Sequence, residues 1–291
     1  MPLDLSPYAS CELCPRRCSA ARLEGRRGVC GATTELKVAR AAPHYWEEPP
    51  ISGEAGSGAI FFSGCTLRCV FCQNHEISSG GFGHVVTVSR LARMMLELQG
   101  KGVLNINLVT PMHVAPQVRE AVIEARAAGL AIPTVCNTGG YELPETVRMM
   151  SDVIDVWLTD FKYASGELAG RLSGAPDYPD VAARALGAML DSVGRAGGAE
   201  SGDDGRMLRG VIVRHLVMPG HADDSCAVLD RVWGIAGNEV DLSVMNQYTP
   251  NERCRRAGGE LARGVSDEEY ERVLDHADDL GFERLWWQQG G

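Results

Sequence analysis

The chain has 291 residues, of which 45% are apolar, and it carries a formal net charge of −10. This size and composition suit one substantial core with a small appendage, and the acidic balance excludes a duplex-binding protein, which needs a basic surface. The sequence contains no run of about 18 apolar residues and no basic leader before an apolar stretch, so we expect no membrane span and no export signal. The ten cysteines therefore favour metal or redox chemistry in a reducing compartment, and we expect a cytoplasmic protein.

The first 50 residues are rich in cysteine and arginine and show little regular periodicity. Four of their cysteines follow the pattern C-x2-C-x3-C-x11-C, namely Cys11, Cys14, Cys18 and Cys30. Four thiolates complete the shell of a structural zinc ion, and they equally complete the ligand set of an auxiliary [4Fe–4S] cluster. The close spacing of the first three slightly favours iron–sulfur, but thiolates suit both metals. We interpret the five arginines of residues 11–30 as part of a solvated metal-binding loop rather than as a nucleic-acid contact.

Residues 49–58 have the composition of a loop and mark the expected boundary between a cysteine-rich extension, residues 1–50, and a main domain, residues 51–291. In the main domain, apolar stretches of strand length alternate with segments of helical periodicity. Strands are predicted at residues 59–63, 103–109, 132–136, 154–159, 211–217 and 240–246, with a shorter one within 282–287. Helices are predicted at residues 88–99, 116–128, 144–150, 178–193, 223–235 and 267–280, several of them starting with a cap or a proline (Ser89, Pro116, Pro144 and Ser266).

This alternation predicts an α/β fold of parallel strands covered by helices. Six strand–helix units suit a partial (β/α)6 barrel of TIM type better than a flat sheet, although the spacing alone does not separate the two. The Gly-rich, acidic residues 197–205 interrupt the pattern and predict a mobile surface loop.

Three cysteines with the spacing C-x3-C-x2-C directly follow the first predicted strand, at Cys65, Cys69 and Cys72. A compact loop of this kind brings three thiolates to three corners of a [4Fe–4S] cluster and leaves the fourth iron without a local ligand. In parallel barrels, the loops after the strands carry the chemistry. The alternative is a zinc knuckle with His75 as its fourth ligand.

The motif and the segments after it resemble the radical S-adenosylmethionine (SAM) superfamily, in particular the branch similar to pyruvate formate-lyase activating enzymes that has an N-terminal cysteine cluster. The resemblance extends from the loop at residues 49–58 to the sixth predicted strand, through GSGAIFFSGCTLRCVFCQN (56–74), NTGGY (137–141), DVWLTDFKY (155–163), VRHLVMPG (213–220) and QYTP (247–250), and the C-terminal LWW (285–287) also resembles this branch. It implies a partial barrel with SAM across its top, chelated by the open iron and cleaved reductively to a 5′-deoxyadenosyl radical.

The resemblance also implies which residues bind SAM: Asn74, Asn137, Thr138, Asp160, Lys162 and Arg214. The family has an aspartate where this chain has Asn137, so the site at which the family binds a monovalent cation lacks one negative charge here and keeps Asp160 as its carboxylate. Arg214 matches an arginine that contacts SAM.

The end of the second predicted strand departs from the family pattern. A Gly-Gly-Glu type motif usually receives the amino group of SAM there, and this chain has Thr110-Pro111-Met112-His113. The Thr110 hydroxyl and nearby carbonyl oxygens are able to accept from an ammonium group. His113 is a candidate catalytic residue, with a packing or capping histidine as the alternative.

The sequence therefore predicts a radical SAM oxidoreductase that abstracts hydrogen from a substrate, with a glycine of a glycyl-radical enzyme as one candidate. A small molecule or another protein or peptide substrate is an alternative, as is a non-catalytic iron–sulfur or zinc protein. Such an enzyme needs an electron donor, for example a ferredoxin or flavodoxin, and no nucleic-acid partner is expected.

Overall fold

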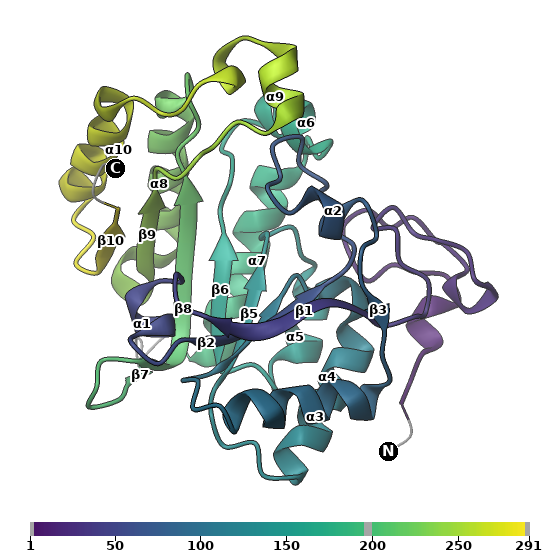
Figure 1. Cartoon of the computed structure of the whole chain (residues 1–291). Helices are drawn as coiled ribbons and strands as arrows, with labels where there is room; N and C mark the ends of the chain where they lie inside the picture. The colour runs from purple at the N-terminus through teal and green to yellow at the C-terminus, as the bar shows by residue number, and fades with distance from the viewer. Residues whose placement is uncertain (1–2, 195–199, 289–291) are drawn as a thin grey trace.

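A computed structural model describes residues 3–194 and 200–288 of the chain. Strands and helices alternate along the main domain (Figure 1). The strands are β1 (Lys37–His44), β2 (Ser57–Phe62), β3 (His84–Val85), β4 (Ile106–Val109), β5 (Thr134–Thr138), β6 (Val156–Asp160), β7 (Glu200–Ser201), β8 (Met207–Leu216), β9 (Asp241–Met245) and β10 (Leu285–Trp287). The helices are α1 (Pro49–Ser52), α2 (His75–Ser78), α3 (Val88–Gln99), α4 (Ala115–Ala127), α5 (Pro144–Met150), α6 (Gly166–Ser173), α7 (Tyr178–Val193), α8 (Ala222–Ala236), α9 (Glu252–Ala257) and α10 (Asp267–Leu280).

The strands form one sheet in the order β10-β9-β8-β6-β5-β4-β2-β1-β3, with β7 paired to β8. From β2 to β10 every neighbouring pair along this order is parallel, and the order follows the chain. A parallel sheet whose strands follow one another in chain order curls into a barrel. In the described ranges its two edge strands, β3 and β10, do not pair with each other, so the barrel is open. The predicted partial α/β barrel is thus confirmed.

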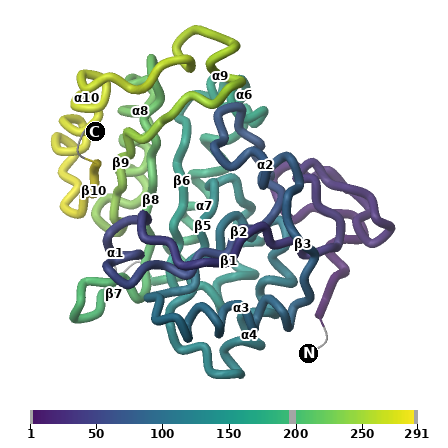
Figure 2. Tube along the Cα trace, viewed as in Figure 1, coloured from purple at the N-terminus to yellow at the C-terminus, as the bar shows by residue number. Residues whose placement is uncertain are grey.

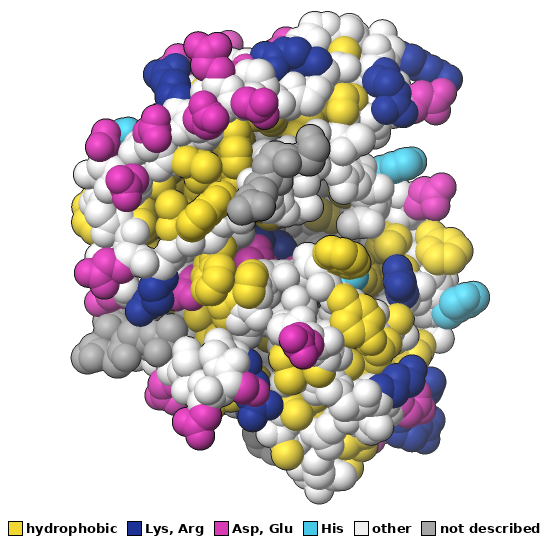
Figure 3. Space-filling view, turned by 60° about the vertical axis from the view of Figure 1, so that its left-hand side comes forward, with side chains coloured by type: hydrophobic (Ala, Val, Ile, Leu, Met, Phe, Trp, Pro, Cys, Tyr) yellow, Lys and Arg dark blue, Asp and Glu magenta, His cyan; other side chains and the backbone are white. Residues whose placement is uncertain are grey.

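The helices pack on the outer face of this sheet and on one another in chain order, α3 on α4, α4 on α5, α5 on α7, α7 on α8 and α8 on α10. The parallel strands are buried almost throughout, as in β5, because helices cover one face and the barrel interior lies behind the other. The face shown in Figure 3 is hollowed, with hydrophobic side chains around the hollow and acidic and basic side chains within it.

Several elements differ from the sequence expectation. Strand β1 lies in the segment expected to be irregular, and it pairs antiparallel with β2. Helix α1 forms within the predicted loop at residues 49–58, and α6 was not predicted. Thr87 rather than Ser89 caps α3, since its hydroxyl accepts from the Arg90 amide, whereas Ser266 caps α10 as expected. Of the predicted loop at 197–205, residues 197–199 lie outside the described residues, and β7 follows them.

The N-terminal segment has two short 3-10 turns, Ser6–Tyr8 and Arg22–Glu24, as its regular structure before β1. Figure 2 shows it as a separate coil at the side of the barrel that carries α2 and β3, on the opposite side from α10 and the C-terminus. Tyr8, Cys11 and Leu13 form a small apolar cluster of its own. The division of the chain at residue 50 stays a prediction.

In the described ranges, no helix combines the length and the apolar character that crossing a membrane requires.

Candidate active site

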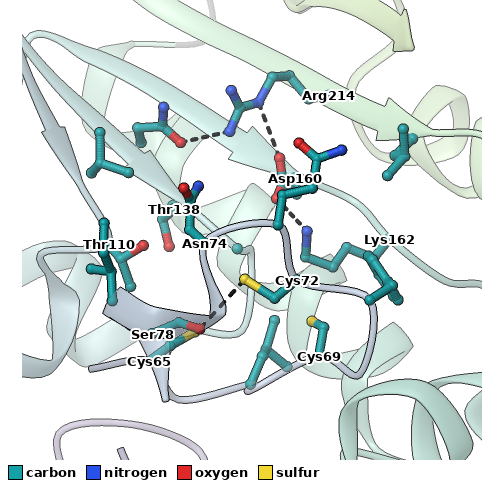
Figure 4. Close-up of a pocket in the computed structure, with 18 of the residues that line it drawn as sticks. Cys65, Cys69, Cys72, Asn74, Ser78, Thr110, Thr138, Asp160, Lys162 and Arg214 are labelled. Atoms are coloured by element: carbon teal, nitrogen blue, oxygen red, sulfur yellow. Dashed lines mark hydrogen bonds and ion pairs between the residues drawn. The ribbon is translucent and has the colours of Figure 1, made fainter. Parts of the chain in front are cut away.

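A cavity lies at the carboxyl ends of the parallel strands, and residues from β2 and the loop after it, and from the ends of β4, β5, β6, β8 and β9, line it. Parallel strands end at the same rim of a barrel, so side chains far apart in the sequence meet there. The lining includes the three cysteines and all seven predicted SAM contacts, namely Cys65, Cys69, Cys72, Asn74, Thr110, Asn137, Thr138, Asp160, Lys162 and Arg214 (Figure 4). His113 is the one predicted residue of the main domain that does not line it.

The three cysteines of the loop after β2 are free thiols at one wall of the cavity. Burial raises the pKa of the Cys65 thiol to about 12 and also raises the pKa of Cys69. Two hydroxyls donate to the sulfurs, Ser78 Oγ to Cys72 at 3.4 Å and Ser173 Oγ to Cys69 at 3.0 Å. Thiols with raised pKa values are held as thiolates by a metal, and three half-buried sulfurs at one wall of the cavity fit iron.

The surroundings of these thiols supply no fourth protein ligand among the described residues that line the cavity. His75, the candidate fourth ligand of a zinc knuckle, is exposed on α2 and is absent from the lining. The one carboxylate of the lining, Asp160, is already held by two cations. Three thiolates with an open fourth corner fit a [4Fe–4S] cluster better than a tetrahedral zinc site.

Opposite the thiols, Asp160 lies between two cations at the end of β6 (Figure 4). Lys162 Nζ donates to its Oδ2, and Arg214 Nε donates to its Oδ1 at 3.0 Å. Burial alone would raise the pKa of Asp160, but the two cations outweigh it and lower the pKa below its usual range. The cavity therefore offers an ionised acceptor beside two cationic donors, which suits a ligand with both an ammonium and a carboxylate group.

Arg214 has a second set of partners. Its guanidinium donates to Asn137 Oδ1 at 2.5 Å and to Glu47 Oε2 at 3.3 Å. Glu47 follows β1 in the N-terminal part of the chain, and Asn107 donates to its other oxygen at 3.1 Å. Glu47 is not among the residues predicted from the sequence, because no motif around it signals a contact with β8.

The backbone is unusual at two points of the cavity wall. Thr110 has a φ of +58°, a conformation that is strained for a β-branched residue, and its amide donates to Asn137 O at 2.8 Å. Gly140 has a φ of +77°, and a Cβ there would lie 2.1 Å from Asp160 O. The NTGG segment therefore approaches β6 closely, which a larger residue would prevent.

His113 lies behind the cysteine loop and is buried. Its Nε2 donates to Ser63 O at 2.9 Å, and a Cβ at Gly64 would lie 3.0 Å from the same nitrogen. Burial lowers the pKa of His113 to about 4, so its ring is neutral at physiological pH. The imidazole thus holds the end of β2, where the cysteine loop begins, and its direct part in catalysis stays a prediction.

The four N-terminal cysteines are free thiols as well, with Cys11, Cys14 and Cys30 buried and Cys18 half-buried. In the described ranges, no three His, Cys, Asp or Glu side chains are placed as the ligands of a single ion would be. Metal binding by these four cysteines stays a prediction.

The comparison with known proteins agrees with this geometry. Residues 59–191 match the model of the Radical SAM superfamily, a range that runs from β2 into α7. The uncharacterized protein MJ0674 of Methanocaldococcus jannaschii is 27% identical over 289 residues, which cover 96% of this chain and 77% of that protein.

Solved structures share the fold. Methylornithine synthase (PylB) aligns over 79% of this chain and 70% of its own at a TM-score of 0.55 and 14% identity. SuiB of Streptococcus suis aligns over 78% of this chain at a TM-score of 0.53 and 15% identity, and the match spans about half (47%) of the SuiB chain. A radical SAM methyltransferase of Sphaerobacter thermophilus aligns over 80% of this chain and 67% of its own at a TM-score of 0.50 and 13% identity. At these identities, the likeness is one of fold.

Proposed function

We propose that the chain is a radical SAM enzyme, since residues 59–191 match the model of that superfamily, and that it binds a [4Fe–4S] cluster at Cys65, Cys69 and Cys72 and cleaves SAM reductively. The observation that carries the proposal is the meeting of three free thiols and the Asp160–Lys162–Arg214 group across one cavity. When bound, the cluster supplies the electron that splits SAM into methionine and a 5′-deoxyadenosyl radical.

The residues of the chain bind and orient the cofactor. Arg214 and Lys162 hold the carboxylate side of SAM, while Asp160 and Thr138 accept from its ammonium or hydroxyl groups. Asn74, Thr110 and Asn137 complete the polar lining. Ser78 donates to Cys72 Sγ and Ser173 donates to Cys69 Sγ, and these hydrogen bonds would stabilise the negative charge of the two thiolate ligands.

We propose hydrogen abstraction from a substrate as the step that follows, with a glycine of a partner glycyl-radical enzyme as the first candidate. A peptide or small-molecule substrate is the second candidate. It has support from the fold neighbour SuiB, whose structure was solved bound to its precursor peptide SuiA. The reaction needs a one-electron donor such as ferredoxin or flavodoxin and suits the reducing cytoplasm. Residues 1–50 supply a second metal site in this proposal.

Anaerobic reconstitution tests the proposal directly. The protein is incubated with iron, sulfide, dithionite and SAM, and 5′-deoxyadenosine is measured by chromatography. We expect the product only when all four components are present. A cluster-replete protein that forms no 5′-deoxyadenosine would instead support a non-catalytic iron–sulfur protein.

A further inference from the structure

The two cysteine sites of this chain lie against each other. The amide of Cys65 donates to the carbonyl oxygen of Cys30 at 3.2 Å, which joins a ligand of the active-site cluster to the last cysteine of the N-terminal set. Gly64 has a φ of +100°, and a Cβ there would lie 2.7 Å from the same carbonyl oxygen. The glycine thus permits a closeness that other residues would prevent.

Arg16 makes a second connection between the two loops. It lies between Cys14 and Cys18, and its Nε donates to Thr66 O at 2.8 Å. Its Nη2 donates to Ser173 O at 2.8 Å, and the Ser173 hydroxyl donates in turn to Cys69 Sγ. The N-terminal cysteine loop is therefore fixed to both ends of the Cys65–Cys69 segment.

Arg22 places a buried guanidinium beside the N-terminal thiols. Its side chain is buried against the Tyr8 ring at 3.8 Å, and its Nη1 donates to Cys11 Sγ at 3.5 Å. Its other acceptors are the carbonyl oxygens of Thr33 and His113, and in the described ranges it has no carboxylate partner. A buried cation without a counter-ion is costly, and four thiolates around a metal centre would supply the counter-charge.

Two sulfurs of this set also lie close together. A Cβ at Gly28 would lie 3.3 Å from Cys18 Sγ and 3.4 Å from Cys30 Sγ, so these two sulfurs flank the same point. A donor such as Arg22 beside the sulfur of an iron–sulfur cluster stabilises its reduced state.

The outer surface of the loop is slightly basic in an otherwise acidic protein. Its exposed charged residues are Arg17, Arg26 and Arg27 against Glu12 and Glu24, whereas the whole chain has a net charge of −10. Arg26 and Arg27 are exposed, as are the apolar side chains of Leu23 (51%) and Val29 (42%). A basic face with an apolar part suits an acidic electron-carrier protein, which it would steer by charge.

We propose that Cys11, Cys14, Cys18 and Cys30 bind a second [4Fe–4S] cluster, which passes electrons from an acidic carrier protein docked on this face to the active-site cluster. When bound, the second cluster would take one electron from the reduced carrier, which is thereby oxidised, and would pass it to the cluster held by Cys65, Cys69 and Cys72. That electron would be consumed as one sulfonium carbon–sulfur bond of SAM breaks, which gives methionine and the 5′-deoxyadenosyl radical. This inference rests on the proposed function for its last step.

Metal content and spectroscopy of the reconstituted full chain test the site. We expect about eight irons per chain and no zinc, and an electron paramagnetic resonance spectrum of the reduced protein broadened by coupling between two neighbouring clusters. About four irons with one tightly held zinc would overturn the inference. These readouts need no SAM cleavage, so they stay informative if the proposed function fails.

Two variants test the relay through the ratio of the SAM cleavage rate with reduced flavodoxin to the rate with dithionite. Cys18→Ser removes the half-buried ligand. We expect this variant to contain about half the iron of the wild type and to show a much lower ratio of the two rates. Cys226→Ser, on α8, is the matched control and should have the iron content and the rate ratio of the wild type. The double variant Arg26→Glu/Arg27→Glu leaves the cysteines intact and should lower the ratio about tenfold at low salt.

An unchanged ratio in the arginine variant would show that the carrier does not dock on this face. An unchanged ratio in a folded Cys18→Ser variant would show that electrons do not pass through the second cluster.

Discussion

The Thr138 hydroxyl donates to Glu142 Oε1 and so joins a residue of the cavity wall to a carboxyl group buried behind it. The second oxygen of Glu142 has no hydrogen-bond partner among the described residues. Burial raises the pKa of Glu142 to about 8, although the Thr138 hydrogen bond opposes the shift. Glu142 is therefore protonated at neutral pH.

This raised pKa predicts a pH dependence of stability. Below an ordinary pKa of 4.5, Glu142 is neutral in both the folded and the unfolded chain. Between that pH and about 8 the unfolded chain loses the proton while the folded chain keeps it, so the stability that the neutral form provides falls as pH rises. The loss is at most roughly 5 kcal/mol. Urea unfolding at pH 5, 7 and 9 measures it.

Glu142→Gln should remove most of this slope, because an amide does not ionise. Glu54→Gln, at an exposed carboxyl group, is the matched control and should unfold like the wild type at each pH. Parallel pH profiles for Glu142→Gln and wild type would show that the buried carboxyl does not titrate in this range.

Single replacement of Cys65, Cys69 or Cys72 by Ala should abolish 5′-deoxyadenosine formation. Each thiolate holds one iron, and with two ligands the loop no longer keeps the open corner toward the cavity. Chromatography of anaerobic assays measures the product, and circular dichroism checks the fold. Cys226→Ala should retain activity, and product from any of the three cluster variants would contradict the ligand assignment.

The apolar pattern of the buried parallel strands was sufficient to predict the barrel, and the family resemblance together with the cysteine motif indicated ten residues that the structure gathers at the strand ends. The sequence could not predict Glu47, which reaches Arg214 from a segment 167 residues away through an arrangement that only the folded chain defines. Ser173 was missed for the same reason, since it lies on the unpredicted helix α6. Whether His113 faces the cavity depends on the direction of its side chain after the strand end, and hydrophobic periodicity does not predict that direction.

Asp160→Asn and Arg214→Ala should weaken SAM binding about ten- to a hundredfold while leaving the absorption spectrum of the cluster intact. Both side chains lie in one ion-paired group, and removing one member leaves a buried partner less well compensated. Anaerobic equilibrium dialysis with labelled SAM measures the affinity. Arg231→Ala, which breaks the surface pair with Asp180, is the control. If both site variants bound SAM with wild-type affinity, SAM would have to bind in another part of the cavity.

His113→Ala should lower the iron content and the thermal stability of the protein, because the hydrogen bond to Ser63 O and the packing against Gly64 both disappear. The neutral, buried ring touches the loop that holds the cluster and does not line the cavity, so SAM affinity and the cleavage rate per cluster should stay near wild type. His113→Gln is the matched variant, since its amide is able to donate to the same carbonyl oxygen and should restore part of the iron content. Iron analysis, thermal unfolding and cleavage assays normalised to cluster content separate the two roles. A stable, cluster-replete His113→Ala protein with reduced SAM affinity or cleavage would instead establish direct contact between His113 and the reacting groups.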